Sequence, residues 1–370
     1  MIDISHKLSP EVEDWFVSGF ISRIRYRLYK SPQPVKPVYS FERKFYRKLA
    51  LDRSCAFKFI TMSPKMMETV FNSPLFKKHR LFFLLCLPKE VRHSKAFGFH
   101  TYREFKNLPK DACGIPIDEL SNLIRERAIK IFDYGYFSKK PEDKVSKSGW
   151  NAYSFSQKVM PKTCPFCNTS PNKLLIKNDE AKARPALDHY FCQSKYPFFG
   201  VNIKNLVPSC TICNSTLKQK LDFINIPHVS PYERGITNNF MFTIRPKVES
   251  LTDIWEHIST CSDFNSEELS IQFDSIDSTS QMDNNAATFN IAGQHDCTKD
   301  QYLSFISKLA RTKKSALKDI LPILEGLDNR YVGKTIDEAG LLYLDVPDEE
   351  HAADIAFTAI KNSLYKIYFC

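Results

Sequence analysis

The chain has 370 residues, is 43% hydrophobic and 13% aromatic, and carries a formal net charge of +10. This composition excludes a globally disordered protein, and the length favours two or three domains over one. The strongest apolar run, residues 81–87, is far too short to span a bilayer, so we expect a buried helix or strand there and no membrane association. The sequence opens without a signal-peptide pattern, and the eleven cysteines do not suit a secreted disulfide framework, so we expect a cytoplasmic protein.

Charge is distributed unevenly along the chain. Residues 1–150 contain 29 Lys and Arg against 16 Asp and Glu, and residues 151–245 contain 12 against 5. Residues 246–370 reverse the balance, with 11 basic and 21 acidic side chains. The basic segments predict a surface for a polyanion, with solubilised helix faces as the alternative. We expect three domains, at residues 1–147, 148–245 and 246–370, in an α+β protein.

The first domain is expected to be mainly helical. Apolar residues recur at helical spacing in residues 41–49. From residue 115 onward a second helix is predicted, because Leu120, Ile124, Ala128 and Ile131 fall on one face. Residues 138–148 are rich in Lys, Pro, Glu and Ser, which predicts a linker to the next domain.

Two Cys-x-x-Cys pairs mark the central domain. Cys164 and Cys167 form the first pair, and Cys210 and Cys213 form the second. Two thiolates three positions apart in a tight turn can chelate one ion, and two such turns complete a tetrahedron. The spacing therefore predicts a structural zinc site. A site closed by four cysteines leaves no open coordination position, so we do not expect this zinc to be catalytic.

Residues suited to phosphodiester chemistry lie between and beside the cysteine pairs. Asp188 offers a carboxylate for a hard divalent ion such as Mg²⁺, and His189 offers an imidazole that can act as a general base. Asn214 follows the second pair where a helix should begin, and its amide oxygen could ligate the same ion. Asn205 precedes that pair and is expected to hydrogen-bond backbone and hold the hairpin that presents His189. Taken singly, each of these residues would default to a turn or cap position.

The acidic last domain is expected to be mixed α/β. Residues 269–273 alternate as in a strand, residues 302–327 read as a helix pair broken at Pro322, and residues 352–368 read as a terminal helix. No chemistry is evident in this region.

The central segment resembles the HNH endonucleases in their four-cysteine branch. Residues 187–197, with the sequence LDHYFCQSKYP, look like the family's Asp-His hairpin, and residues 205–214, NLVPSCTICN, look like its second knuckle and helix start. The resemblance covers residues 164–220 and implies a ββα-metal module. Relatives usually have Pro and Lys where this chain has Cys192 and Gln193. The family's His-Pro-Tyr is interrupted here after His228, which we expect to be a core or surface histidine.

The resemblance implies roles for individual residues. His189 would be the general base, Asp188 and Asn214 would hold a catalytic Mg²⁺ or Mn²⁺, and Asn205 would orient the loop of the base. Lys218 would contact a phosphate, and Zn²⁺ would be held by the four cysteines.

These roles make a metal-dependent endonuclease the favoured function, with DNA preferred to RNA as substrate. The resemblance also suggests an antiviral (anti-phage) defence effector with a regulatory partner such as an ATPase. The alternative is a non-catalytic, zinc-stabilised module that binds nucleic acid or a partner protein.

Overall fold

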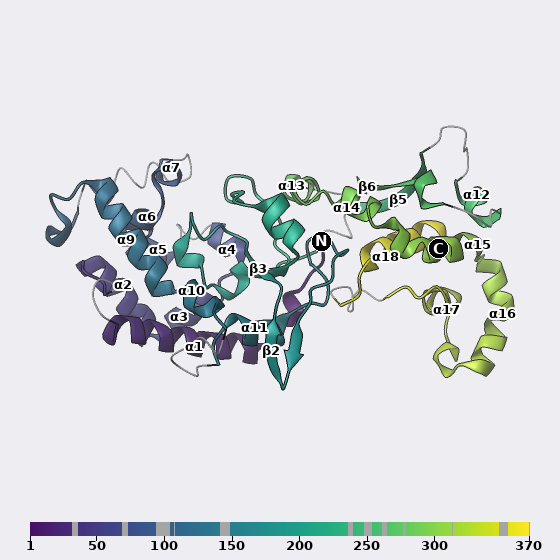
Figure 1. Ribbon diagram of the computed structural model, residues 1–370, viewed down its shortest axis with the longest axis horizontal. Coiled ribbons are helices and arrows are strands. Elements are labelled where there is room, and N and C mark those ends of the chain that lie inside the picture. The colour runs from purple at the N-terminus through teal and green to yellow at the C-terminus, as the bar shows by residue number, and fades with distance from the viewer. Residues whose placement is uncertain are drawn as a thin grey trace.

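The computed structural model describes residues 1–31, 36–68, 73–93, 104–106, 108–140, 149–235, 240–247, 254–260, 265–276, 279–312, 314–347 and 354–369. Over these residues the protein is α+β and mostly helical, with three two-stranded antiparallel sheets. The molecule is elongated, with the N-terminal helices at one end, the cysteine-rich segment in the middle and the C-terminal region at the other end (Figure 1). No helix within these ranges is both long enough and apolar enough to cross a membrane.

The N-terminal region is helical throughout its described part, as the sequence predicts. The long helix α1 begins at Pro10 because Ser9 caps it, accepting a hydrogen bond from the Val12 amide, and it buries one apolar face. The helices of this region are α1 (Pro10–Tyr29), α2 (Ser40–Leu51), α3 (Arg53–Ile60), α4 (Pro64–Glu68), α5 (Pro74–Lys78), α6 (Arg80–Cys86), α7 (Lys89–Arg92), α9 (Ile117–Phe132) and α10 (Tyr134–Ser138).

Two sequence expectations for this region are confirmed. The apolar run at residues 81–87 forms the buried helix α6, which packs against α9. The predicted face of α9, made by Leu120, Ile124, Ala128 and Ile131, is fully buried. The predicted linker lies for its greater part, residues 141–148, outside the described residues.

The central region begins with α11 (Ala152–Val159), followed by two hairpins. The first joins β1 (Leu175–Lys177) to β2 (Glu180–Ala183), and the second joins β3 (Ala186–His189) to β4 (Leu206–Ser209). In the second hairpin Asp188 lies opposite Val207 and His189 opposite Leu206. A helical segment with π geometry, Ile212–Lys218, follows β4. The order of elements here is strand, strand, helical segment.

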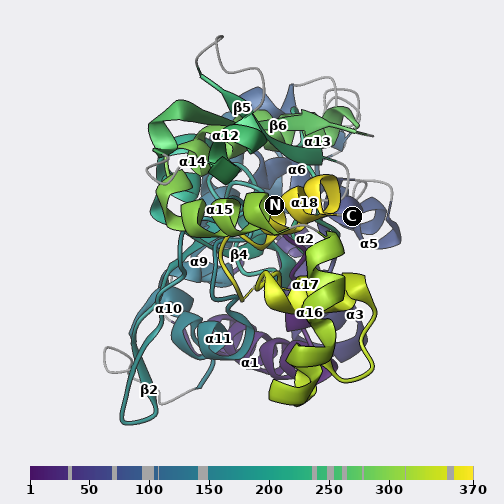
Figure 2. The ribbon, with the colours of Figure 1, turned by 90° about the vertical axis from the view of Figure 1, so that its right-hand side faces the viewer.

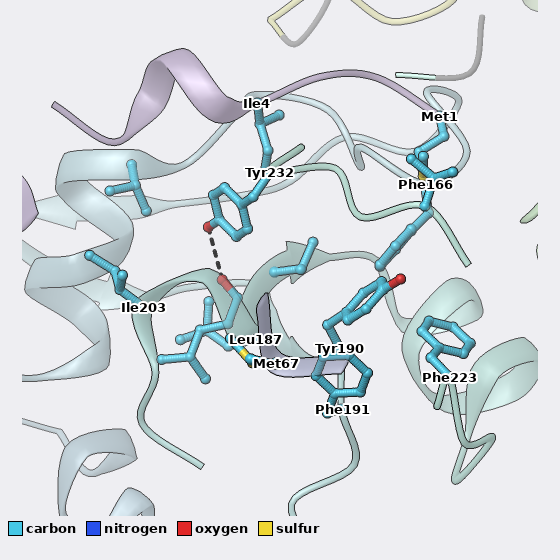
Figure 3. Packing of buried hydrophobic residues seen from close by; sticks show 14 of the residues in the cluster. Met1, Ile4, Met67, Phe166, Leu187, Tyr190, Phe191, Ile203, Phe223 and Tyr232 are labelled. Carbon is cyan, nitrogen blue, oxygen red and sulfur yellow. Dashed lines mark hydrogen bonds between the residues drawn. The ribbon is translucent and has the colours of Figure 1, made fainter. Parts of the chain in front are cut away.

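A continuous apolar core holds the second hairpin in place. Leu187, Tyr190 and Phe191 pack with Phe166 from the first cysteine turn and with Phe223 (Figure 3). The hydroxyl of Tyr232 donates a hydrogen bond of 2.9 Å to the carbonyl of Leu206, which anchors β4 from the opposite side (Figure 3).

The C-terminal region pairs a hairpin with helices. Strands β5 (Phe240–Pro246) and β6 (Leu269–Ser275) are antiparallel, and α15 and α18 lie side by side beneath them (Figure 2). The predicted strand at residues 269–273 is therefore confirmed. The helices are α12 (Ile254–Thr260), α13 (Ser280–Thr288), α14 (Ile291–Asp296), α15 (Leu303–Arg311), α16 (Lys314–Leu327), α17 (Ile336–Tyr343) and α18 (Thr358–Tyr368).

Two expectations for this region need correction. The helix pair exists, but its break falls between Arg311 and Lys314, and Pro322 lies inside α16. Proline costs the helix one hydrogen bond to the carbonyl four residues earlier, that of Lys318, and Lys318 is exposed, so water can satisfy that carbonyl. The terminal helix begins at Thr358, later than the predicted residue 352. Residues 348–353 lie outside the described residues.

Segments from both ends of the chain close over the central region. The Ile2 amide donates to the Pro165 carbonyl at 2.7 Å, and the Phe357 amide donates to the Asn168 carbonyl at 2.8 Å. Both bonds reach the first cysteine turn, so this turn is fixed by chain segments more than 150 residues away on either side.

Candidate active site beside a four-cysteine metal centre

The four predicted zinc ligands come together. The sulfur atoms of Cys164, Cys167, Cys210 and Cys213 lie within 4.8 Å of one another, and three of the four side chains are buried. Sulfurs at the corners of a zinc tetrahedron lie about 3.8 Å apart, given a Zn–S bond of about 2.3 Å. Four cysteine sulfurs gathered this closely match the donor set of a tetrahedral thiolate site, so the cluster fits a metal ion such as zinc.

Asparagine side chains shape the two cysteine turns. Asn168 adopts a left-handed backbone conformation with φ of 58°, and its amide donates to the Cys164 carbonyl at 2.8 Å, which closes the first turn. The Asn172 side chain donates to the carbonyls of Thr163 at 2.9 Å and Pro208 at 3.4 Å. One amide group therefore ties the first turn to the strand that leads into the second.

Helix α14 of the C-terminal region supplies an outer layer to the cysteine cluster. The Gln294 side-chain nitrogen lies 3.6 Å from the sulfur of Cys213, and His295 Nε2 lies 3.1 Å from the carbonyl of Cys167. Polar groups around ligand sulfurs orient them and tune the bound metal. The acidic region thus contributes to the metal centre, a connection that the sequence did not reveal.

Asp188 lies buried on β3 and forms an ion pair with Lys218. The side-chain nitrogen of Lys218 lies 2.9 Å from Asp188 Oδ1 and donates at 2.6 Å to the backbone carbonyl of His189. Each residue is only 2% exposed. Burial raises the pKa of the Asp188 carboxyl, and the neighbouring Lys218 ammonium opposes this shift. The other oxygen, Oδ2, is buried and has no hydrogen-bond partner in the described part of the chain.

His189 is half-buried and fixed in one tautomer. Its Nε2 lies 2.9 Å from the carbonyl of Gly200, which can only accept a hydrogen bond, so Nε2 carries the proton and Nδ1 carries the lone pair. Burial lowers the pKa of His189 to about 4, with the Gly200 carbonyl opposing this shift and the Lys218 charge adding to it. The imidazole is therefore neutral at pH 7 and can accept a proton.

Asn205 clamps the loop that follows His189. Its side-chain oxygen accepts from the Phe191 amide at 2.7 Å, and its nitrogen donates to the carbonyls of Phe191 at 3.1 Å and Phe199 at 3.0 Å. The side chain is fully buried. These three bonds give Asn205 the backbone-holding position expected from the sequence, one residue before the partner of His189 in β4.

Two predicted residues take positions that differ from their expected roles. Asn214 is half-buried, and its side chain donates to Ser215; within the described residues no hydrogen bond joins it to Asp188 or Lys218. Lys218 points inward to Asp188 and not to the surface, where a phosphate would meet it. Lys218 joins Asp188 to the His189 carbonyl, and Asn205 holds the loop that follows, whereas the Asn214 side chain bonds only Ser215 among the described residues.

Tyr134 and Arg184 belong to the site although the sequence did not single them out. The Tyr134 ring stands edge-on to the His189 imidazole, with centroids 4.3 Å apart. Burial raises the pKa of the Tyr134 hydroxyl, and the nearby Arg184 guanidinium opposes this shift. Tyr134 lies more than 50 residues before His189 and carries no motif, so only the fold could reveal it.

Two further positions are settled by their packing. His228 is a core histidine, stacked on Phe223 at 3.8 Å and bonded through Nε2 to the Thr288 hydroxyl at 2.8 Å. The thiol of Cys192 lies 3.1 Å from the hydroxyl of Ser194.

The description of the site rests on the sequence and the structure of this chain alone. Comparison with known proteins finds no matching family model, no matching curated protein and no matching solved structure.

Proposed function

We propose that the protein is a metal-dependent endonuclease of the HNH type, with DNA as the favoured substrate. The observation that carries this proposal is the pairing of a neutral imidazole with a buried, half-satisfied carboxylate. His189 presents Nδ1 as its free basic atom, and the adjacent Asp188 has an oxygen without a partner. Base and carboxylate are fixed on one strand that is anchored against a rigid, cysteine-held scaffold.

The chemistry assigned to this chain begins at His189. Its Nδ1 would take a proton from water as that water attacks a phosphodiester phosphorus. The Gly200 carbonyl holds the ring orientation and stabilises the imidazolium that forms, because it accepts from the other ring nitrogen. Asn205 keeps the loop from Phe191 to Gly200 in register, so it acts as a positioning residue.

The orphaned oxygen of Asp188 is the position at which a hard cation would be held. A bound Mg²⁺ or Mn²⁺ would stabilise negative charge that develops on the phosphate and the leaving oxygen. Asp188 Oδ2 fits this role because a buried carboxylate oxygen without a partner is costly in the folded protein. The pairing of Oδ1 with Lys218 leaves Oδ2 open to such an ion.

Arg184 extends the positive charge of the site. Its guanidinium lies near the Tyr134 hydroxyl, and the Tyr134 ring packs on His189, which supports a role for Arg184 in contacting the scissile phosphate. Arginine is suited to phosphate because its planar fork offers several donors.

Supercoiled plasmid is the direct test of this proposal. Purified protein should convert it to nicked or linear forms with Mg²⁺ or Mn²⁺ and not without a divalent ion. His189→Ala should remove the activity, and His6→Ala, which changes an exposed histidine outside the site, should retain it. Cleavage by the His189→Ala protein at the rate of the native protein would end the proposal.

A second candidate function is a non-catalytic, zinc-stabilised binding module. The internal ion pair favours it, because Lys218 already neutralises Asp188 without any bound cation. This alternative predicts binding of nucleic acid without cleavage, and the same affinity with and without Mg²⁺. Binding unchanged by Asp188→Asn, in a preparation that never nicks plasmid, would favour it over the nuclease.

A further inference from the structure

One face of the N-terminal helices combines open cavities, cations and exposed aromatic rings. The larger cavity, of about 550 Å³, lies along α1 and against α10. Its wall is built from basic and aromatic side chains together with Gly19 and Ser22; the basic and aromatic members are Arg23, Arg25, Arg27, Lys30, Tyr26, Tyr29, Tyr136 and Trp150.

A smaller cavity of about 200 Å³ continues this face toward α2. It is lined by Leu28, Tyr29, Lys36, Pro37, Arg43 and Arg47. Tyr29 belongs to both cavities, so the two adjoin across its ring. We call the residues of these two cavities the Tyr29 face.

The Tyr29 face is strongly positive. Among the residues that the structure describes, no aspartate or glutamate lines either cavity. Arg23 and Arg27 share Asp133, at 2.5 Å and 2.6 Å, and are thereby fixed in position. A second group of cations has no ion pair with any described residue: Arg25, Lys30, Lys36 and Arg47.

Two tyrosines of this face are exposed to a degree unusual for large aromatic side chains. Tyr26 is 45% exposed and Tyr29 is 53% exposed, one helical turn apart on α1. The Arg23 guanidinium lies 3.5 Å from the centre of the Tyr136 ring and 4.9 Å from that of Tyr26, so it holds the wall between them. Exposed rings among unpaired cations are the combination with which proteins bind single-stranded nucleic acid, since rings stack on bases and cations follow the phosphates.

We infer that the Tyr29 face binds a single-stranded segment of nucleic acid, with bases stacked on Tyr26 and Tyr29 and phosphates on Arg25, Lys30 and Arg47. The bases of a duplex are stacked on one another, so a duplex would contact the cations through its phosphates and would not stack on the tyrosine rings. This inference deepens the proposed nuclease function by naming a substrate form and the surface that holds it.

Helix α10 connects this face to the proposed active site. Tyr136 of α10 packs on Arg23 in the wall of the larger cavity, and Tyr134 of the same helix packs on His189. The two surfaces therefore adjoin through one helix of five residues. A strand held on the Tyr29 face would continue toward His189 around this helix.

Fluorescence anisotropy with labelled oligonucleotides tests the inference in full-length protein, in buffer without divalent ions so that binding is measured apart from cleavage. Tyr26→Ala/Tyr29→Ala should raise the Kd for a single-stranded oligonucleotide about tenfold or more and change the Kd for a duplex of equal length far less. Arg25→Glu/Arg47→Glu should weaken binding of both forms and reduce the dependence of affinity on salt. The control Lys58→Glu/Lys318→Glu makes the same charge change at exposed positions outside the face and should leave both affinities within about twofold.

The outcomes separate this inference from the nuclease proposal. Equal losses in the charge variant and its control would overturn the assignment of the face. Equal losses of affinity for single strand and duplex in the tyrosine variant would overturn the single-strand preference. Tight binding of polyglutamate at the same face would identify an acidic protein, and not nucleic acid, as its ligand. His189→Ala should bind like the native protein whether or not the native protein cleaves. Circular dichroism of each variant confirms that a loss of binding is not a loss of folding.

Discussion

Replacing Lys218 by methionine tests the buried ion pair that organises the proposed site. The substitution keeps the length of the side chain and removes an ammonium 2.9 Å from Asp188 Oδ1 and 2.6 Å from the His189 carbonyl. Asp188 Oδ2 already lacks a hydrogen-bond partner among the described residues, so the substitution would leave a buried carboxylate without a neighbouring cation. Breaking such a pair from one side costs about 3–5 kcal/mol, against a total stability of about 5–15 kcal/mol for a domain.

The loss should depend on pH in a defined direction. Burial raises the pKa of Asp188, and removal of Lys218 takes away the charge that opposes the shift. A carboxyl with a raised folded-state pKa favours the folded protein at low pH, and this contribution disappears as pH rises through that pKa. Lys218→Met should therefore cost more stability at pH 8 than at pH 5.

Urea unfolding at the two pH values measures this effect. Lys220→Met is the matched control, because Lys220 is exposed two positions away, and it should change the free energy of unfolding by less than about 0.5 kcal/mol. Asp188→Asn/Lys218→Met removes both charges and should recover most of the loss. A Lys218→Met protein as stable as the native one, or equally destabilised at both pH values, would show that Lys218 does not compensate the buried charge of Asp188.

Four further predictions follow from the site. Native protein should contain one zinc per chain by elemental analysis, and Cys164→Ser/Cys213→Ser should contain none. The variant should also unfold at a lower temperature, because metal binding contributes folding free energy. A native protein that contains no metal and is no more stable than the variant would contradict this. The acid limb of kcat/KM should fall near pH 4 and not near 6.5, since burial lowers the pKa of His189 to about 4 and the base stays neutral down to that pH; an inflection at the unperturbed value would argue against His189. Asn205→Ala should destabilise the protein by roughly 2–4 kcal/mol in urea unfolding and slow cleavage, because the Phe191 amide and carbonyl lose their partner and the Phe199 carbonyl keeps only the Asn202 amide. A free energy of unfolding within about 0.5 kcal/mol of native, together with a native cleavage rate, would count against the clamp. Burial lowers the pKa of His228 to about 4, so between pH 6.5 and 4 the unfolded chain binds a proton at His228 and the folded chain does not. Acidification across this range should therefore lower the free energy of unfolding by on the order of 3 kcal/mol through His228. This loss should be absent from His228→Phe in urea unfolding at the same pH values.

The parts of this fold that local patterns determine could be predicted from the sequence. Apolar spacing predicted α9 and its buried face, because a helix repeats every 3.6 residues whatever surrounds it. Cysteine spacing predicted the metal cluster, because two short chelating turns need only come together in space. The hairpin that carries Asp188 and His189 followed from a motif whose residues lie within 30 positions of one another.

The parts that tertiary contacts determine could not be predicted. The inward direction of Lys218 depends on the π geometry of Ile212–Lys218, in which the Gln219 amide reaches back five residues to the Asn214 carbonyl at 3.1 Å. Tyr134 reaches His189 only because α9 ends at Asp133 in a left-handed conformation that turns the chain into α10. The sequence predicts a break at Pro322 because the cost of proline to a helix is visible there, whereas the exposed carbonyl that reduces this cost is visible only in the structure.

The proposed mechanism requires a hard cation at Asp188, beside a neutral His189. It also requires a second metal ion among the four cysteines that holds the scaffold. Anomalous X-ray scattering from crystals of the protein soaked in Mn²⁺ tests this directly. We predict a zinc peak among the four cysteine sulfurs and a manganese peak about 2.2 Å from Asp188 Oδ2, with the Asp188→Asn protein retaining the first and losing the second. A native protein that shows no manganese peak at Asp188, at a Mn²⁺ concentration that supports plasmid cleavage, would contradict the proposed mechanism.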